Sequence, residues 1–134
     1  DKMTENSRVS DYYSLLGQLT YYGNGGVKED KQQAFNLFIK GSDVGGGIDT
    51  GLCMTWVGFC YSTGNGVEQD VNKAVEWYEK AVEAGNISAS YYLGEIYEKG
   101  KGDIAADLAK AKEYYKKGAD AGNKACKDKL AELE

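Results

Sequence analysis

Apolar side chains recur along the chain at the spacing of an amphipathic helix. Ala89, Leu93 and Tyr97 follow one another at positions i, i+4 and i+8, so they would share one face of a helix. Ala111 and Tyr115 repeat the i, i+4 spacing further along the chain. The pattern predicts two helices, each buried along one face and joined by a short connection.

This pair of helices is one of three sequence copies. The clearest copy runs from Val57 to Gly85, the next from Leu93 to Gly122, and a looser copy from Leu16 to Gly45. We call the first helix of each copy helix A and the second helix B. A Gly-x-Gly motif lies between them in every copy, where glycine can adopt the positive φ of a tight reversal. An aspartate then stands where the N-cap of helix B is expected; these residues are Asp30, Asp70 and Asp107.

A glycine also recurs inside every helix A, at positions 17, 58 and 94. Glycine inside a helix costs about 1 kcal/mol relative to alanine, so its recurrence in one register needs a reason. We expect the backbone of helix B to come close at these points, near the alanines that begin its buried face. Those alanines are Ala34, Ala74 and Ala111.

The spacing, the turn, the capping aspartate and the aromatic pairs of helix B together resemble the Sel-one-like repeat family, a relative of the tetratricopeptide repeats. The resemblance covers roughly residues 12–126. It implies an all-α fold, a right-handed α-α superhelix (solenoid) of three helix-hairpin repeats plus a C-terminal capping helix, in a single domain over residues 1–134. The expected boundaries are about 12–48, 53–85 and 89–122 for the repeats and about 123–133 for the capping helix.

Composition excludes several functional classes. Lys and Arg number 16 against 21 Asp and Glu, a net charge of -5, and without clustered positive charge no nucleic-acid partner is expected. Histidine is absent, which removes Ser-His and Cys-His nucleophiles and the HExxH zinc site. We therefore expect no catalytic residues, no cofactor and no metal. No apolar run approaches the length of about 20 residues needed to cross a bilayer, so no membrane insertion is expected.

Three cysteines bear on the redox environment. Cys53 and Cys60 are seven residues apart on one predicted helix, about 10 Å, so they cannot pair with each other. In the cysteine-rich branch of the family a disulfide joins each helix B to the following helix A, and Cys53 and Cys126 occupy the second of those positions. The partner positions hold Ser42 and Ala119, so this disulfide is not expected. Free, mostly buried thiols favour a reducing, cytoplasmic compartment, although a removed signal peptide stays open.

The candidate site is an aromatic strip on the outward side of the A helices. Positions pointing away from the buried stripe carry large rings in successive copies. Leaving such rings bare would forgo several kcal/mol at roughly 25 cal/mol per Å², so we expect something to cover them. The predicted partner-binding residues are Tyr21, Tyr22, Leu52, Trp56, Phe59, Tyr91, Tyr92 and Glu95. Coverage by solenoid curvature, by residues 1–10 or by a second copy of the chain is the alternative.

The function that these residues and the resemblance favour is a non-catalytic scaffold or adaptor that binds a peptide or protein segment on the concave surface of the A helices. Self-association is a further possibility. The alternative is a small-ligand-binding protein or a weak, β-lactamase-like hydrolase, because some cysteine-rich members of the family are described in that way. The residues give it little support: no Ser-x-x-Lys motif occurs, and no nucleophile has a base within its own repeat.

Overall fold

The structure is a computed structural model that describes residues 2–134, with the backbone alone at residue 3. Helices and turns make up this part of the chain, and it contains no strand. The helices are α1 (Lys2–Tyr22), α2 (Lys31–Ser42), α3 (Thr50–Thr63), α4 (Val71–Glu83), α5 (Ser88–Lys99), α6 (Leu108–Asp120) and α7 (Lys124–Leu133).

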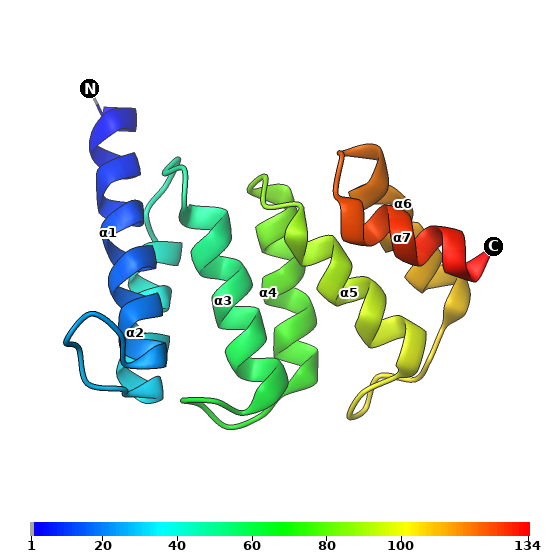
Figure 1. Ribbon diagram of the computed structural model, residues 1–134, viewed down its shortest axis with the longest axis horizontal. Coiled ribbons are helices and arrows are strands. Elements are labelled where there is room, and N and C mark those ends of the chain that lie inside the picture. The colour runs from blue at the N-terminus through cyan, green and yellow to red at the C-terminus, as the bar shows by residue number, and fades with distance from the viewer. Residues whose placement is uncertain (1) are drawn as a thin grey trace.

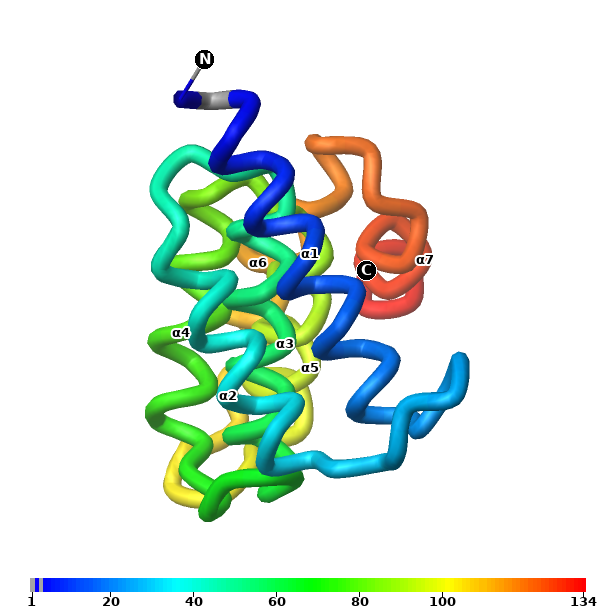
Figure 2. Tube along the Cα trace, turned by 90° about the vertical axis from the view of Figure 1, so that its left-hand side faces the viewer, coloured from blue at the N-terminus to red at the C-terminus, as the bar shows by residue number. Residues whose placement is uncertain are grey.

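Successive helices form three hairpins that stack side by side (Figure 1). Helices α1, α3 and α5 are the A helices and form one layer, while α2, α4 and α6 are the B helices and form the other (Figure 2). The first two B helices, α2 and α4, each pack against the A helix of the next hairpin, and α7 packs against α6 as a closing helix. The expected all-α solenoid of three helix hairpins and a C-terminal helix is therefore confirmed.

The local signals that the sequence predicted are present at the start of each B helix. The capping aspartate has an extended backbone, and its side chain accepts a hydrogen bond from the backbone N–H three residues later. The pairs are Asp30 with Gln33 at 3.0 Å, Asp70 with Lys73 at 3.1 Å and Asp107 with Lys110 at 3.1 Å. Both glycines of every Gly-x-Gly turn have positive φ, so residues with a Cβ would be strained there.

The glycines inside the A helices lie under aromatic rings. A Cβ on Gly17, Gly58 or Gly94 would come within 3.0 Å of ring carbons on the paired B helix. The rings belong to Phe38, Tyr78 and Tyr115. The expectation that a backbone approaches these glycines was wrong: the ring lies one helical turn beyond the small alanine of helix B, and glycine leaves room for its flat face.

All three cysteines are free and buried. Burial raises the pKa of Cys53 to about 12, and it raises the pKa of Cys60 to about 12 as well. These thiols therefore behave as small apolar side chains in the core. Among residues 2–134, no helix combines the length and the apolar character that crossing a bilayer requires.

Candidate functional site

One predicted site residue lies in the core. Tyr21 was expected to point outward, but its side chain is only 5% exposed. Its hydroxyl accepts a hydrogen bond from Asn65 Nδ2 at 2.8 Å, and Lys31 Nζ lies 4.2 Å from the centre of its ring. Asn65 belongs to the Gly-x-Gly turn of the following repeat, so this position of helix A faces the next repeat and not solvent. The assignment of Tyr21 to an open surface was therefore wrong.

The other predicted residues are partly or largely accessible. Tyr22 is 55% exposed, and the remaining six are half-buried. Five of the seven line one cavity of about 330 Å³ that spans three A helices. The cavity is lined by Tyr22, Leu52, Trp56, Phe59 and Tyr92, together with Gln18, Thr55 and Ser88. Helices α1, α3 and α5 therefore share one apolar cavity on their common face.

The floor of this cavity is held in place by stacking. The indole of Trp56 lies parallel to the ring of Phe38, with ring centroids 5.0 Å apart and an interplanar angle of 6°. Tyr22 and Phe59 each meet Trp56 edge to face, at 5.9 Å. Such pairs are worth about 0.5–1.5 kcal/mol beyond the area they bury. One face of Trp56 thus belongs to the core, and the residue still lines the cavity.

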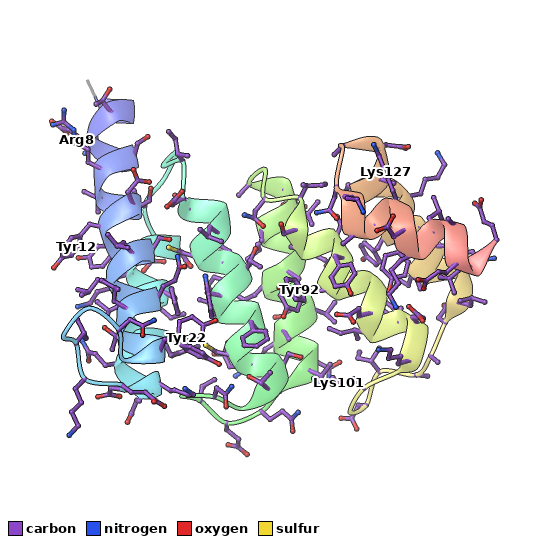
Figure 3. All side chains as sticks on the ribbon, in the orientation of Figure 1. Arg8, Tyr12, Tyr22, Tyr92, Lys101 and Lys127 are labelled. Carbon is purple, nitrogen blue, oxygen red and sulfur yellow. The ribbon has the colours of Figure 1, made fainter. Side chains whose placement is uncertain are left out.

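A second cavity of about 240 Å³ continues from the first, toward the C-terminal ends of α3 and α5. It shares Phe59 and Tyr92 with the first cavity and is also lined by Tyr78. We call the two cavities together the aromatic groove. Figure 3 shows Tyr22 and Tyr92 on the face that the A helices form, with Lys101 in the turn that follows α5.

The second cavity contains the charged groups of the groove, and only one of them was predicted. Glu95, a predicted residue, forms an ion pair with Lys99 at 3.8 Å. Lys101 Nζ donates a hydrogen bond to Ser62 Oγ at 3.0 Å. Lys101 was missed because it lies within a Gly-x-Gly turn, where the sequence indicates only backbone geometry. The sequence offers one signal for Lys101: a lysine stands in this turn at the position where the preceding turn has the neutral Asn65.

Tyr91 lies outside the aromatic groove. Its ring is 5.8 Å from that of Tyr92 and 6.1 Å from that of Tyr115, and it packs against the cluster that α7 closes. Burial raises the pKa of Tyr91, and the carboxylate of Glu95 raises it further. Tyr91 and Glu95 therefore mark the boundary between the groove and the closing helix.

The groove does not offer the donor set of a metal site. Within the part of the chain that the structure describes, no three His, Cys, Asp or Glu side chains come together in a way that could hold a metal ion. The lining consists of aromatic rings, aliphatic side chains, hydroxyl groups and the charges of the second cavity. This chemistry suits the burial of apolar side chains with a few polar contacts.

Comparison with known proteins gives three matches to one family model. The model of the Sel1 repeat matches residues 10–45, 51–86 and 87–123, which is most of the chain. Among curated proteins, chitin synthase regulatory factor 3 of Schizosaccharomyces pombe is 31% identical over 97 residues, which cover 72% of this chain and 10% of that protein.

Solved structures of repeat proteins share the fold. A Sel1 repeat protein from Oxalobacter formigenes is 32% identical, with a TM-score of 0.79 over 97% of this chain and 50% of the other. A protective antigen of uropathogenic Escherichia coli strains with an SLR fold is 29% identical, with a TM-score of 0.79 over 92% of this chain and 25% of the other. Helicobacter pylori cysteine rich protein B, 20% identical and with a TM-score of 0.68, has the same fold over 96% of both chains. The chain thus spans half or less of the length of the curated relative and of the first two structures.

Proposed function

Because the chain belongs to the Sel1 repeat family, we propose that it is a non-catalytic scaffold that holds a peptide or protein segment in the aromatic groove. Sel1 repeat proteins are generally protein-interaction scaffolds, and most of them are not enzymes. We infer that the partner binds along the A helices, because these helices line the aromatic groove.

The observation that carries the proposal is the placement of Trp56. Its indole is fixed by the stack on Phe38, and it lines a cavity to which three successive A helices contribute. A rigid aromatic anchor loses little conformational entropy on binding, which is why such residues dominate the energetics of protein interfaces. A groove that crosses several helices suits an extended segment, whose side chains enter successive cavities.

The test uses two tyrosines of α1 that are equally accessible. Tyr22 lines the groove and is 55% exposed, whereas Tyr12 is 59% exposed, lines neither cavity and points away from α3 (Figure 3). Peptides are selected from a random displayed library on the wild-type protein and are then measured against Tyr22→Ser and Tyr12→Ser. Neither change is expected to unfold the protein, because both rings are largely exposed.

We expect Tyr22→Ser to weaken peptide binding by about fivefold or more, the effect of about 1 kcal/mol. Tyr12→Ser should bind like the wild type. If no peptide is enriched on the wild-type protein, or if the two variants lose affinity equally, the groove is not the binding site.

A weak hydrolase is the second candidate, and one contact favours it. The hydrogen bond from Lys101 Nζ to Ser62 Oγ places a lysine beside a serine in the second cavity, an arrangement that can activate a hydroxyl group. Ser90, the other serine of the A helices to consider, is fully buried and out of reach of a substrate. If the wild type hydrolyses a β-lactam reporter and Ser62→Ala does not, the protein is a hydrolase and not a non-catalytic scaffold.

A further inference from the structure

We propose that Lys101 forms a subsite of the aromatic groove for the carboxylate of an acidic side chain. This inference rests on the proposed function and adds the chemistry of the partner. The bound segment would carry an apolar or aromatic anchor for the first cavity and an aspartate or glutamate for the second.

Lys101 brings an uncompensated positive charge to the groove. The other cation of the second cavity, Lys99, is paired with Glu95 at 3.8 Å. The ammonium of Lys101 instead contacts the neutral hydroxyl of Ser62, and among the described residues no carboxylate lies within ion-pair distance of it. The protein as a whole has a net charge of -5, so a local positive charge beside aromatic rings distinguishes this end of the groove.

The ammonium group of Lys101 is not needed as a hydrogen-bond donor to the carbonyl groups at the C-terminal end of α3. Lysine near a helix C-terminus often binds the last carbonyl groups. At the end of α3 these carbonyls already have donors. Cys60, Tyr61 and Ser62 accept hydrogen bonds from the backbone of Gly64, the backbone of Asp70 and the side chain of Gln69.

The preceding repeat shows that a neutral residue can make the same connection. Asn65 occupies the position of Lys101 in its own turn, and its amide reaches back to Tyr21 as Lys101 reaches back to Ser62. Both contacts join a turn to the A helix of the repeat before it. In that repeat the long side chain is the tyrosine, and here it is the lysine. A contact between turn and helix therefore does not require a charge, and the ammonium group of Lys101, which contacts only a hydroxyl group, can also bind a ligand.

The backbone at Lys101 is fixed, which makes the position of its charge well defined. The residue follows Gly100, and its backbone exchanges two hydrogen bonds of 2.9 Å with Ile104. A side chain that leaves a rigid turn loses less entropy on binding than one on a mobile loop.

The spacing of the two cavities sets the spacing of the ligand's side chains. On α5 the first cavity is lined by Ser88 and Tyr92, and the second extends from Tyr92 to Gly100 and on to Lys101. The centres of these segments are separated by about 10 Å at 1.5 Å per helical residue. An extended peptide covers this distance in about three residues. The acidic residue is therefore expected about three positions from the anchor.

The test repeats the peptide selection on the wild type, on Lys101→Asn and on Lys28→Asn. Lys101→Asn restores the Gly-Asn-Gly turn of the other two copies, so its fold should be intact. Lys28→Asn is the matched control, because it removes an exposed cation from the connection between α1 and α2, which lines neither cavity of the groove. The displayed peptides are fused at their C-terminal ends, so a free terminal carboxylate cannot contribute.

We expect wild-type peptides to combine an aromatic or aliphatic residue with Asp or Glu about three positions away. Replacing that acid by its amide should weaken binding to the wild type by about fivefold, and the affinity should fall as salt is added. Lys101→Asn should remove both the preference for the acid and the dependence on salt, while Lys28→Asn keeps them.

Three results would overturn the proposal. Peptides that bind in the groove without any preference for an acid would leave the scaffold function standing and remove the subsite. A preference for acid that survives in Lys101→Asn would assign the charge recognition to another residue. If the protein dimerises in sedimentation experiments and no peptide is enriched, a second copy of the chain covers the groove, and both proposals fail.

Discussion

The sulfur atom of Cys53, on α3, packs so closely against Gly41, on α2, that a Cβ on Gly41 would overlap it. The same pairing recurs where the closing helix docks, between Gly118 and Cys126. At the corresponding positions between the second and third repeats both residues are alanines, Ala81 and Ala89, and both are fully buried. Consecutive repeats are thus joined through pairs of residues whose combined size is small.

This pairing predicts that the two positions are energetically coupled. Gly41→Ala should destabilise the protein by about 1–2 kcal/mol, because the overlap with Cys53 outweighs the gain in helix propensity. In combination with Cys53→Ala the overlap is removed, so most of that loss should be recovered, with a coupling energy of about 1 kcal/mol or more. Urea unfolding of the single and double variants measures the coupling, and Gly45→Ala, which meets no atom within 4 Å, is the control. Strictly additive effects would show that the two residues do not share space.

A second prediction concerns Ser90, whose hydroxyl is buried and has no hydrogen-bond partner among the residues that the structure describes. A buried hydroxyl without a partner loses its hydration and gains nothing in return. Ser90→Ala should therefore leave the free energy of unfolding unchanged or raise it by about 1 kcal/mol. Ser42→Ala is the matched comparison, because the hydroxyl of Ser42 donates to the carbonyl of Phe38 at 2.8 Å, and we expect that variant to be less stable. A clear loss of stability in Ser90→Ala would mean that its hydroxyl is bonded in solution.

The cysteines should be unreactive in the native protein. With the pKa of Cys53 and that of Cys60 both raised to about 12, only about one thiol in ten thousand is ionised at mildly alkaline pH, and the thiolate is the reactive species. Burial also raises the pKa of Cys126. A thiol reagent should modify the folded protein only as fast as it unfolds and should modify every cysteine once denaturant is added. Rapid labelling of one cysteine in the native state would contradict the packing described above.

The closing helix is held by a network around Glu98. Tyr115 Oη donates a hydrogen bond to Glu98 Oε1 at 2.7 Å, and Lys129 Nζ, on α7, lies 3.5 Å from the same atom. The hydrogen bond from Tyr115 lowers the pKa of Glu98, and the charge of Lys129 lowers it further. Because the folded-state pKa lies below the unfolded one, this contribution to stability is complete above the ordinary pKa of glutamate and is lost as pH falls through the lowered value.

Glu98→Gln should therefore be less stable than the wild type at neutral pH by about 1.5–2 kcal/mol, the lower part of the range for hydrogen bonds to a charged group, because an amide oxygen can still accept from Tyr115. The difference should shrink as the pH falls below about 4. Urea unfolding across this pH range is the measurement, with Glu76→Gln, at an exposed position on α4, as the control. An unchanged difference between the two proteins at acid pH would mean that ionised Glu98 contributes nothing to stability.

The elements of the fold could be predicted because their signals are local. The apolar spacing of each helix, the Gly-x-Gly turns and the capping aspartates each act within one or two turns of the chain. Asp30, Asp70 and Asp107 therefore have the predicted role. The glycines of the A helices were identified as points of close approach, but the ring that covers each of them could not be inferred from the alanine spacing alone.

Contacts between repeats explain where the prediction of the site failed. Tyr21, Ser62 and Glu98 occupy one register of the A helices, and a residue of a later element binds each of them. Asn65 is 44 residues from Tyr21, and Lys101 is 39 residues from Ser62. The pattern of one helix at a time does not reveal partners at such separations, so it predicts a surface position for Tyr21 and no role for Lys101.

Binding of a segment of another chain in the aromatic groove can be tested most directly through Trp56. The chain has two tryptophans, and the second, Trp77, lies on α4 in the opposite layer and lines neither cavity of the groove. In a Trp77→Phe variant the emission therefore reports on Trp56 alone. When a peptide from the library selection is titrated, we expect the Trp56 emission to shift to shorter wavelength and to become protected from acrylamide quenching as the site fills. Saturable binding that leaves both signals of Trp56 unchanged would place the partner elsewhere on the protein and contradict binding in the groove.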